Sequence, residues 1–231
     1  MARRKKKKTK TDLSNTVRSI VKKEKPIIGI DFGSSSIKII SMKKNHKLDK
    51  WIIETLPIGM MNQGRIEAKE PLAEIIKKAL KTYKIKTKHC ALYLSSNELI
   101  VRELTFPQME DIHIRENIAH EISSMLPQDH EEYYMDYKVL EYIPGQAEEE
   151  EGQLRVLAAA VPENLLRDYV DTLGLAGLKV KYIDVLPNIG GKLCKLIYKR
   201  ESIIRPKNIC MIDFGAKKTE TVIYNDGNYS L

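Results

Sequence analysis

Residues 27–40 read IIGIDFGSSSIKII, and a similar stretch, ICMIDFGAKKTETVIY, occupies residues 209–224. Each stretch places an Asp-Phe-Gly turn between apolar runs, a pattern typical of two strands joined by a tight turn. Such a turn exposes backbone N–H groups that can hold phosphate oxygens, and an aspartate at the strand end suits Mg²⁺. The two aspartates, Asp31 and Asp213, are 182 residues apart. The repeat predicts two related halves that bind one nucleoside triphosphate between them.

The composition is that of a globular protein. The 231-residue chain is 42% hydrophobic, enough for one large core or two modest ones. No stretch approaches the ~18 to 20 consecutive apolar residues of a membrane span, and the N-terminus lacks the apolar run of a secretory signal. Cys90, Cys194 and Cys210 show neither a CxxC motif nor a Cys/His cluster. We therefore expect three buried thiols and a cytoplasmic protein.

The net charge of +8 is concentrated at the N-terminus. Residues 1–25 hold 11 of the 39 Lys/Arg and 2 of the 31 Asp/Glu, so this tail carries +9, and the remainder, with 28 basic and 29 acidic residues, carries −1. A basic tail can condense on nucleic acid, anionic lipid or an acidic protein. Leu13, Val17, Ile20 and Val21 share one helical face. The tail is therefore either a disordered solubilising arm or an amphipathic segment at a membrane surface, and no specific nucleic acid is expected.

The apolar pattern divides the rest of the chain into α/β segments. Three strands, a helix that opens at Pro71 and a returning strand come first. A strand-helix-strand-strand unit follows, then a helix after Pro162, a strand, a connecting helix and the second Asp-Phe-Gly turn. NDGN at residues 225–228 predicts a two-residue hairpin. We expect strands at residues 27–30, 37–42, 51–56, 89–94, 99–106, 133–143, 154–161, 179–186 and 219–224, and helices at residues 109–126 and 188–198.

Three segments resemble the motifs of the superfamily that comprises actin, the heat-shock chaperones and sugar kinases. DFGSSSIK at residues 31–38 is similar to its first phosphate loop, and DFGAKKTET at residues 213–221 to its second. YIDVLPNIGGKL at residues 182–193 resembles the helix that connects the two domains. The three segments also follow one another in the order found in the superfamily.

The middle of the chain narrows this resemblance to one family. SSNELIVRELTFPQM (95–109), AHEISSMLPQDHEEYYMDYKVL (119–140) and RVLAAAVPENLLRDYVDTLGLAGLKVKYIDV (155–185) resemble PilM, the actin-like protein of type IV pilus assembly, to which the cell-division protein FtsA is related. The resemblance implies an α/β, actin-like (ribonuclease H-like) domain I with an inserted strand-helix-strand-strand subdomain, and a second actin-like half that is truncated. The expected divisions are 1–25 (tail), 26–97 (first part of domain IA), 98–161 (inserted domain IC), 162–206 (second part of IA and connecting helix) and 207–231 (start of domain IIA).

The same resemblance implies a ligand, a partner and a location. ATP with Mg²⁺ would occupy the cleft between the domains, and the N-terminal peptide of a PilN-like inner-membrane protein would dock in a groove between IA and IC. The protein would then be a nucleotide-dependent scaffold, cytoplasmic and peripheral at the inner face of the cell membrane, with oligomers possible. The residues that line the peptide groove do not follow from the sequence.

Individual residues are carried over from the two phosphate loops. Asp31 and Asp213 would hold Mg²⁺ through water, and Lys38 would neutralise phosphate charge. A purely structural alternative is that the serines cap a β-turn. The other residues implied to bind the nucleotide are Gly33, Ser34, Ser35 and Ser36 in the first loop and Gly215, Ala216, Lys217 and Thr219 in the second.

Several positions depart from the superfamily pattern. Lys217 stands where actin has another glycine, and its Cβ resists conformations that glycine permits. Leu186 occupies the position of an acidic residue in the chaperones, which argues against efficient ATP hydrolysis. The pair Gly190-Gly191 precedes the second phosphate loop, so we expect it to serve helix packing rather than adenosine binding.

Rival functions remain open on the sequence. An FtsA-like membrane tether of cell division is the nearest alternative within the superfamily. A sugar or acetate kinase would need a catalytic carboxylate near the γ-phosphate, and Asp184 is the strongest candidate. A third possibility is an adaptor that has kept the fold and lost the nucleotide. A protein kinase is excluded, because no His-Arg-Asp motif precedes Asp213 and no ATP lobe precedes Asp31.

Overall fold

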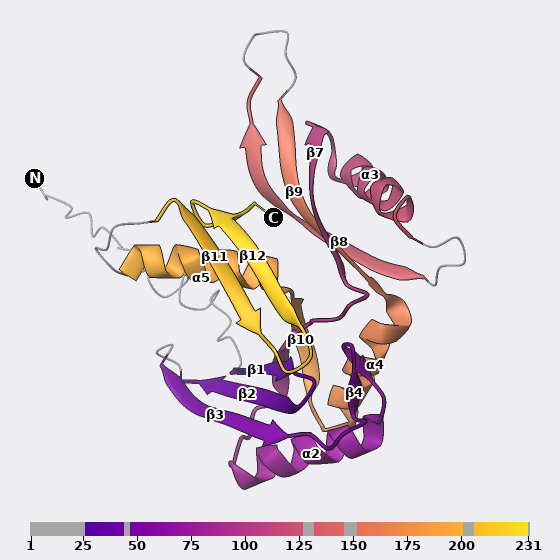
Figure 1. Cartoon of the computed structure of the whole chain (residues 1–231), viewed down its shortest axis with the longest axis vertical. Helices are drawn as coiled ribbons and strands as arrows, with labels where there is room; N and C mark the ends of the chain where they lie inside the picture. Colours follow the sequence, from indigo (N-terminus) through magenta and orange to yellow (C-terminus); the bar gives the residue numbers. More distant parts are fainter. Residues whose placement is uncertain (1–25, 44–46, 127–131, 146–151, 201–205, 231) are drawn as a thin grey trace, which may run out of the picture.

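The structure, a computed structural model, describes residues 26–43, 47–126, 132–145, 152–200 and 206–230. The basic tail and its predicted amphipathic face lie outside these residues. In the described part, no helix has the length and apolar character needed to cross a membrane. Figure 1 shows a first lobe built on a five-stranded sheet, a subdomain that projects from it, and a three-stranded sheet that begins a second lobe.

The first lobe is organised by a mixed five-stranded sheet in the order β10-β6-β1-β2-β3. As predicted, its first three strands form an antiparallel meander, and the two later strands return parallel to β1. The meander needs only short turns, whereas each parallel strand requires a crossover. The strands are β1 (Ile27–Phe32), β2 (Ser36–Met42), β3 (Leu48–Thr55), β6 (His89–Tyr93) and β10 (Lys179–Asp184).

One face of this sheet carries the main hydrophobic core. The alternating residues Ile28, Ile30, Ile37 and Ile39 are at most 2% exposed, beneath the helices α2 (Lys69–Thr82) and α4 (Glu163–Leu175). Pro71 is the third residue of α2 rather than its first. Because side chains alternate along a strand, a slip of β1 by one residue would turn Ile28 and Ile30 out of the core, and the same slip of β2 would turn out Ile37 and Ile39. The core therefore fixes the register of β1 against β2.

The inserted subdomain has a core of its own. Its antiparallel sheet has the order β7-β9-β8 and one covering helix, so the predicted strand-helix-strand-strand order is confirmed. Ile114, Ile118 and Ile122 of the helix pack on Val156 and Ala158 of the central strand. Small alanines on that strand let the helix approach closely. The elements are β7 (Ile100–Pro107), α3 (Asp111–Ser123), which is shorter than expected, β8 (Tyr133–Ile143) and β9 (Gln153–Pro162).

A small hairpin that the sequence analysis missed lies beside the first lobe. Its strands, β4 (Met61–Asn62) and β5 (Arg65–Ile66), are only two residues long. Gln63 and Gly64 both have positive φ, 50° and 86°, as a type I′ turn requires. A Cβ at Gly64 would lie 2.5 Å from the Ser95 carbonyl oxygen. Glycine is therefore needed at this tight approach to the first lobe.

The second lobe begins with a three-stranded sheet packed on the connecting helix α5 (Leu186–Arg200). The helix starts two residues earlier than predicted, directly after the strand β10. Asp226 and Gly227 have φ values of 49° and 75°, so the hairpin predicted from NDGN is confirmed. The strands are β11 (Asn208–Phe214), β12 (Thr219–Asn225) and β13 (Asn228–Tyr229).

The two Asp-Phe-Gly turns differ in what covers them. Phe32 is 5% exposed and meets the Tyr169 ring edge-on at 5.1 Å between centroids, whereas Phe214 is 80% exposed. The helices α2 and α4 cover the first phenylalanine, and no helix among the described residues covers the second. Cys210 lies on the same open face and is exposed. The expectation of three buried thiols was therefore wrong for Cys210 and confirmed for Cys90 and Cys194.

Candidate functional site

The repeated sequence forms two hairpins of the same geometry. In the first, the N–H of Gly33 donates to the carbonyl oxygen of Ser36 at 2.9 Å, and in the second Gly215 donates to Lys218 at the same distance. A Cβ would lie 2.9 Å from the acceptor oxygen at Gly33 and 2.7 Å from it at Gly215. Both turns therefore require glycine. Both glycine N–H groups donate inside the turns, so these two residues shape the loops, and the binding of phosphate by Gly33 stays a prediction.

The register of the strands completes the correspondence. Asp31 pairs with Lys38 across β1 and β2, and Asp213 pairs with Glu220 across β11 and β12. Each aspartate thus stands at the end of its strand, with its partner seven residues later on the returning strand. The two hairpins therefore match in position, but Glu220 carries a negative charge where Lys38 carries a positive one.

Both hairpins line one polar cavity of about 280 Å³. This is near the lower end of ligand sites, which are roughly 300–1,000 Å³, and suits a phosphate chain better than a whole nucleotide. The hairpin of β4 and β5 and the end of β6 close its other sides. The cavity is lined by the predicted residues Asp31, Gly33, Ser34, Ser35, Ser36, Lys38, Asp213, Gly215, Ala216 and Lys217.

Thr219 is the exception among the predicted site residues. It pairs with Phe214 across the hairpin and is exposed, whereas its neighbour Glu220 lines the cavity. Successive side chains of a strand point to opposite faces. Thr219 consequently faces away from Asp213 and is not among the residues that line the cavity, and its role in nucleotide binding stays a prediction.

The charges of the cavity balance across its walls. Lys38 Nζ donates to Asp31 Oδ2 at 2.7 Å. This hydrogen bond, followed by the negative charges of Asp31 and Asp213, raises the pKa of Lys38. Asp31 and Asp213 line the same cavity from different hairpins. Two short carboxylates with neighbouring hydroxyl and ammonium groups fit Mg²⁺ bound to phosphate, because Mg²⁺ is usually held by one or two carboxylates, water and phosphate oxygens.

Four further residues line or border this cavity and were not predicted. Glu220 accepts hydrogen bonds from Tyr93 Oη at 2.7 Å and Ser95 Oγ at 3.0 Å. Lys218 Nζ lies 3.1 Å from the other oxygen of Glu220. The position of Glu220 could have been found from the sequence, because it follows Asp213 by the same seven residues that separate Lys38 from Asp31. Tyr93 is the last residue of β6 and Ser95 follows the strand, and no motif marks them.

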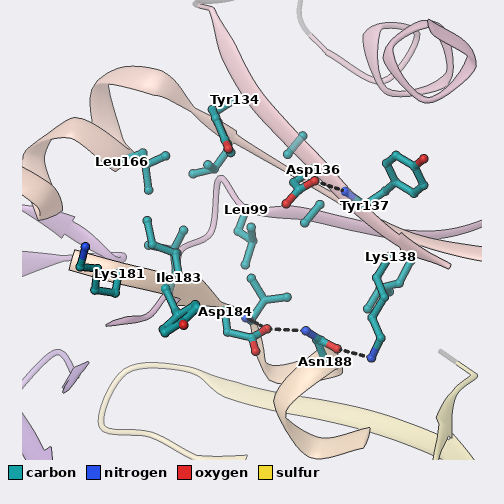
Figure 2. A pocket seen from close by; sticks show the side chains of 17 residues that line it. Leu99, Tyr134, Asp136, Tyr137, Lys138, Leu166, Lys181, Ile183, Asp184 and Asn188 are labelled. Carbon is teal, nitrogen blue, oxygen red and sulfur yellow. Dashed lines mark hydrogen bonds between the residues drawn. The ribbon is translucent and has the colours of Figure 1, made fainter. Parts of the chain in front are cut away.

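A second hollow, a groove of about 570 Å³, separates the first lobe from the inserted subdomain. Figure 2 shows Tyr134 and Lys138 of β8 on one side, Lys181 and Ile183 of β10 on the other, and Leu99 between them. The strands β8 and β10 are both at the edge of their sheets. An edge strand has unpaired backbone groups that can bind an added strand. The groove thus combines a largely apolar lining with two strands that lie at sheet edges in the described part of the chain.

A chain of polar contacts runs along the end of this groove. Lys138 Nζ donates to Asn188 Oδ1 at 2.8 Å, and Asn188 Nδ2 donates to Asp184 Oδ1 at 2.8 Å (Figure 2). Lys192 Nζ donates to Asp184 Oδ2 at 2.7 Å. Burial, followed by the charges of Lys192 and Lys195, lowers the pKa of Lys138. These contacts join the inserted subdomain to the connecting helix α5.

The sheet topology and the paired hairpins around one polar cavity define the actin-like ATPase fold. Comparison with solved structures agrees. A Bacteroides thetaiotaomicron protein of actin-like ATPase fold and unknown function matches with a TM-score of 0.50 at 8% identity, over 91% of this chain and 69% of its own. The cytoplasmic domain of EpsL, an inner-membrane component of the type II secretion system of Vibrio cholerae, matches with a TM-score of 0.51 at 12% identity, over 87% and 71%.

The family is more specific than the fold. The sequence model of the family described as type IV pilus assembly protein PilM matches residues 29–230, and the chain belongs to this family. A solved PilM-PilN type IV pilus biogenesis complex is similar at 22% identity with a TM-score of 0.75, over 89% of this chain and 60% of the matched one. The chain therefore spans somewhat more than half the length of that relative.

Proposed function

We propose that this chain belongs to a nucleotide-dependent scaffold of type IV pilus assembly that holds the N-terminal peptide of a PilN-like membrane protein. The scaffold would work at the cytoplasmic face of the inner membrane. Membership of the PilM family and the likeness to a PilM-PilN complex support this function. The observation that carries it is the presence, in one chain, of two hollows of opposite character: a polar cavity between the hairpins and an apolar groove between two strand edges.

The polar cavity would hold Mg²⁺ and the phosphates of ATP. Asp31 and Asp213 would bind the metal through water from opposite walls, and Lys38 and Lys217 would offset the phosphate charge. The backbone N–H groups of the loops at Ser34, Ser35, Ala216 and Lys217 would donate to phosphate oxygens. Bound Mg²⁺ would supply charge neutralisation between the two lobes.

The apolar groove would hold the peptide in extended form. A peptide added along β8 or β10 would satisfy the free backbone groups of that edge, and its apolar side chains would pack on Leu99, Leu166 and Ile183. Lys138 and Lys181 lie at the margin of this lining. These residues of the groove could not be identified from the sequence alone.

The connecting helix α5 links the groove to the second lobe. Its residue Asn188 lines the groove, and two residues later Gly190 lies so close to Tyr224 of the second lobe that a Cβ there would be 2.0 Å from the hydroxyl oxygen. A rotation of the second lobe driven by nucleotide would therefore move a part of the groove. We expect peptide and Mg-ATP to change each other's affinity by the same factor.

A titration tests the proposed function. The synthetic N-terminal peptide of the PilN-like protein is labelled, and its affinity for the full-length protein is measured by fluorescence anisotropy with and without Mg-ATP. The affinity of a fluorescent ATP analogue is then measured with and without peptide. Equal peptide affinities with and without Mg-ATP would contradict the coupling between the two sites. If the protein binds no nucleotide, the alternative of an adaptor that has kept the fold and lost the nucleotide would be favoured.

Replacing Ile183 with glutamate should weaken peptide binding about tenfold or more, because a charge would enter the apolar lining at the centre of the groove. Ile183 is 38% exposed, so the folded protein should tolerate the change. The matched control is Ile112→Glu, since Ile112 is 56% exposed and lies on α3, outside the groove. Equal affinities of the two variants, measured by the same anisotropy assay, would place the peptide elsewhere.

The sugar kinase alternative loses its candidate residue. Asp184 lines the groove rather than the polar cavity, and both its carboxylate oxygens accept hydrogen bonds, from Asn188 and Lys192. A carboxylate held in this way does not face the phosphates. Contact of the basic tail with the membrane surface and the formation of oligomers stay predictions.

A further inference from the structure

Glu220 joins the two lobes directly at the polar cavity. Its Oε2 accepts hydrogen bonds from Tyr93 Oη and Ser95 Oγ of the first lobe, and its Oε1 faces Lys218 of its own strand. Burial, and then the bond to Glu220, raises the pKa of Tyr93. The phenol therefore keeps its proton and stays a donor, so that both carboxylate oxygens have partners.

The strand registers show what this contact controls. Tyr93 is the partner of Asp31 in the parallel pair of β1 and β6, and Glu220 is the partner of Asp213 in the antiparallel pair of β11 and β12. The hydrogen bond from Tyr93 to Glu220 thus connects the immediate lateral neighbours of the two aspartates. Because each pair is held by its sheet, the length of this bond restricts the spacing between Asp31 and Asp213.

We propose that Glu220 is a positioning residue that clamps the two phosphate loops at the spacing needed for Mg²⁺ and a nucleotide phosphate chain. The inference rests on the nucleotide-binding part of the proposed function. A carboxylate suits the clamp because hydrogen bonds to a charged acceptor are stronger than those to a neutral one. The clamp keeps the cleft closed before nucleotide arrives, so that binding does not have to bring the lobes together.

The test compares Glu220→Ala with Glu220→Gln in the full-length protein. The amide oxygen of glutamine can still accept from Tyr93 and Ser95, whereas alanine removes both bonds. Two spin labels, one on each lobe through Ile58→Cys and Lys207→Cys, report the spacing of the lobes by pulsed electron paramagnetic resonance without nucleotide. All variants carry Cys210→Ser, because the exposed thiol of Cys210 would otherwise take up a third label. Glu74→Ala is the matched control, because Glu74 is exposed on α2, pairs with Lys77 and does not line the polar cavity.

We expect Glu220→Ala to lengthen and broaden the distribution of distances between the labels. It should also weaken binding of a fluorescent Mg-ATP analogue about tenfold, because the hydrogen bonds from Tyr93 and Ser95 to a charged acceptor are lost. Glu220→Gln should lose less than Glu220→Ala in both measurements, because its amide oxygen still accepts both bonds without the charge of the carboxylate. Tyr93→Phe should lie between the wild type and Glu220→Ala. Thermal unfolding of each variant separates this effect from general destabilisation. General destabilisation would lower the melting temperature as well as change the label distances, and glutamine at position 220 would not restore it.

Unchanged label distances in Glu220→Ala would overturn the clamp. Widened distances with unchanged nucleotide affinity would overturn its role in positioning the loops. If the wild type itself binds no nucleotide, the proposed function fails, but the label distances still decide whether Glu220 holds the lobes together.

Discussion

Replacing Gly190 with alanine is expected to lower the free energy of unfolding by about 3 kcal/mol. A Cβ at this position would lie 2.0 Å from Tyr224 Oη and 2.6 Å from Cζ. Tyr224 is fully buried, and its hydroxyl donates to the Leu186 carbonyl oxygen at 3.0 Å. The ring would have to move, which breaks this bond and separates the second lobe from α5. Denaturant-induced unfolding of the full-length variant measures the effect.

The chain provides a matched control for this substitution. Gly174 also lies in a helix, α4, and a Cβ there would have no atom within 4 Å. Gly174→Ala should therefore be neutral or stabilise the protein by up to about 1 kcal/mol, since alanine favours helix more than glycine does. Tyr224→Phe removes the nearest atom and should rescue Gly190→Ala in part. A similar effect of both alanine substitutions would show that Gly190 is not a packing residue.

Replacing Asp31 or Asp213 with alanine should weaken Mg-ATP binding by about a hundredfold, the loss expected when one charged ligand of a bound cation is removed. Without Mg²⁺, the effect of each substitution on the affinity for ATP should be reversed. In EDTA, where the aspartates only repel the triphosphate, each variant should bind ATP as well as the wild type or better. Isothermal titration of the full-length protein with ATP, in Mg²⁺ and in EDTA, measures both effects.

Asp171→Ala is the control for the aspartate variants, because Asp171 is exposed on α4 and does not line the polar cavity. It should leave both affinities unchanged. If Asp31→Ala and Asp213→Ala differ strongly from each other, only one loop would hold the metal. Equal losses in Mg²⁺ and in EDTA would indicate a disturbed fold rather than a lost metal ligand.

Much of the fold was predictable because strong local patterns agree with the tertiary structure. The isoleucines of β1 and β2 alternate, NDGN prescribes its turn, and the repeated Asp-Phe-Gly turns place ten predicted residues around one cavity. The hairpin of β4 and β5 was missed because strands of two residues have no periodicity. Thr219 does not line the cavity, because a motif gives spacing and not the face of the strand.

Other parts of the site depend on contacts that a sequence does not reveal. The groove is formed by β8 and β10, which are separated by β9 and α4 along the chain. Tyr93 and Glu220 are 127 residues apart, and each is ordinary in its own strand. Cys210 follows the alternation of a strand, and its exposure reflects which helices cover that sheet face. Such features arise from packing between segments, whereas turns and strands are encoded locally.

The most direct measurement uses Mn²⁺-ATP as a paramagnetic probe in nuclear magnetic resonance of the full-length protein. Bound Mn²⁺ broadens the signals of nearby amides, so one metal held between the two hairpins should broaden residues 33–36 and 215–218 together, at the same nucleotide concentration. Mg²⁺-ATP should leave those signals sharp. Broadening of one loop alone, or of neither, would contradict a site shared by the two halves.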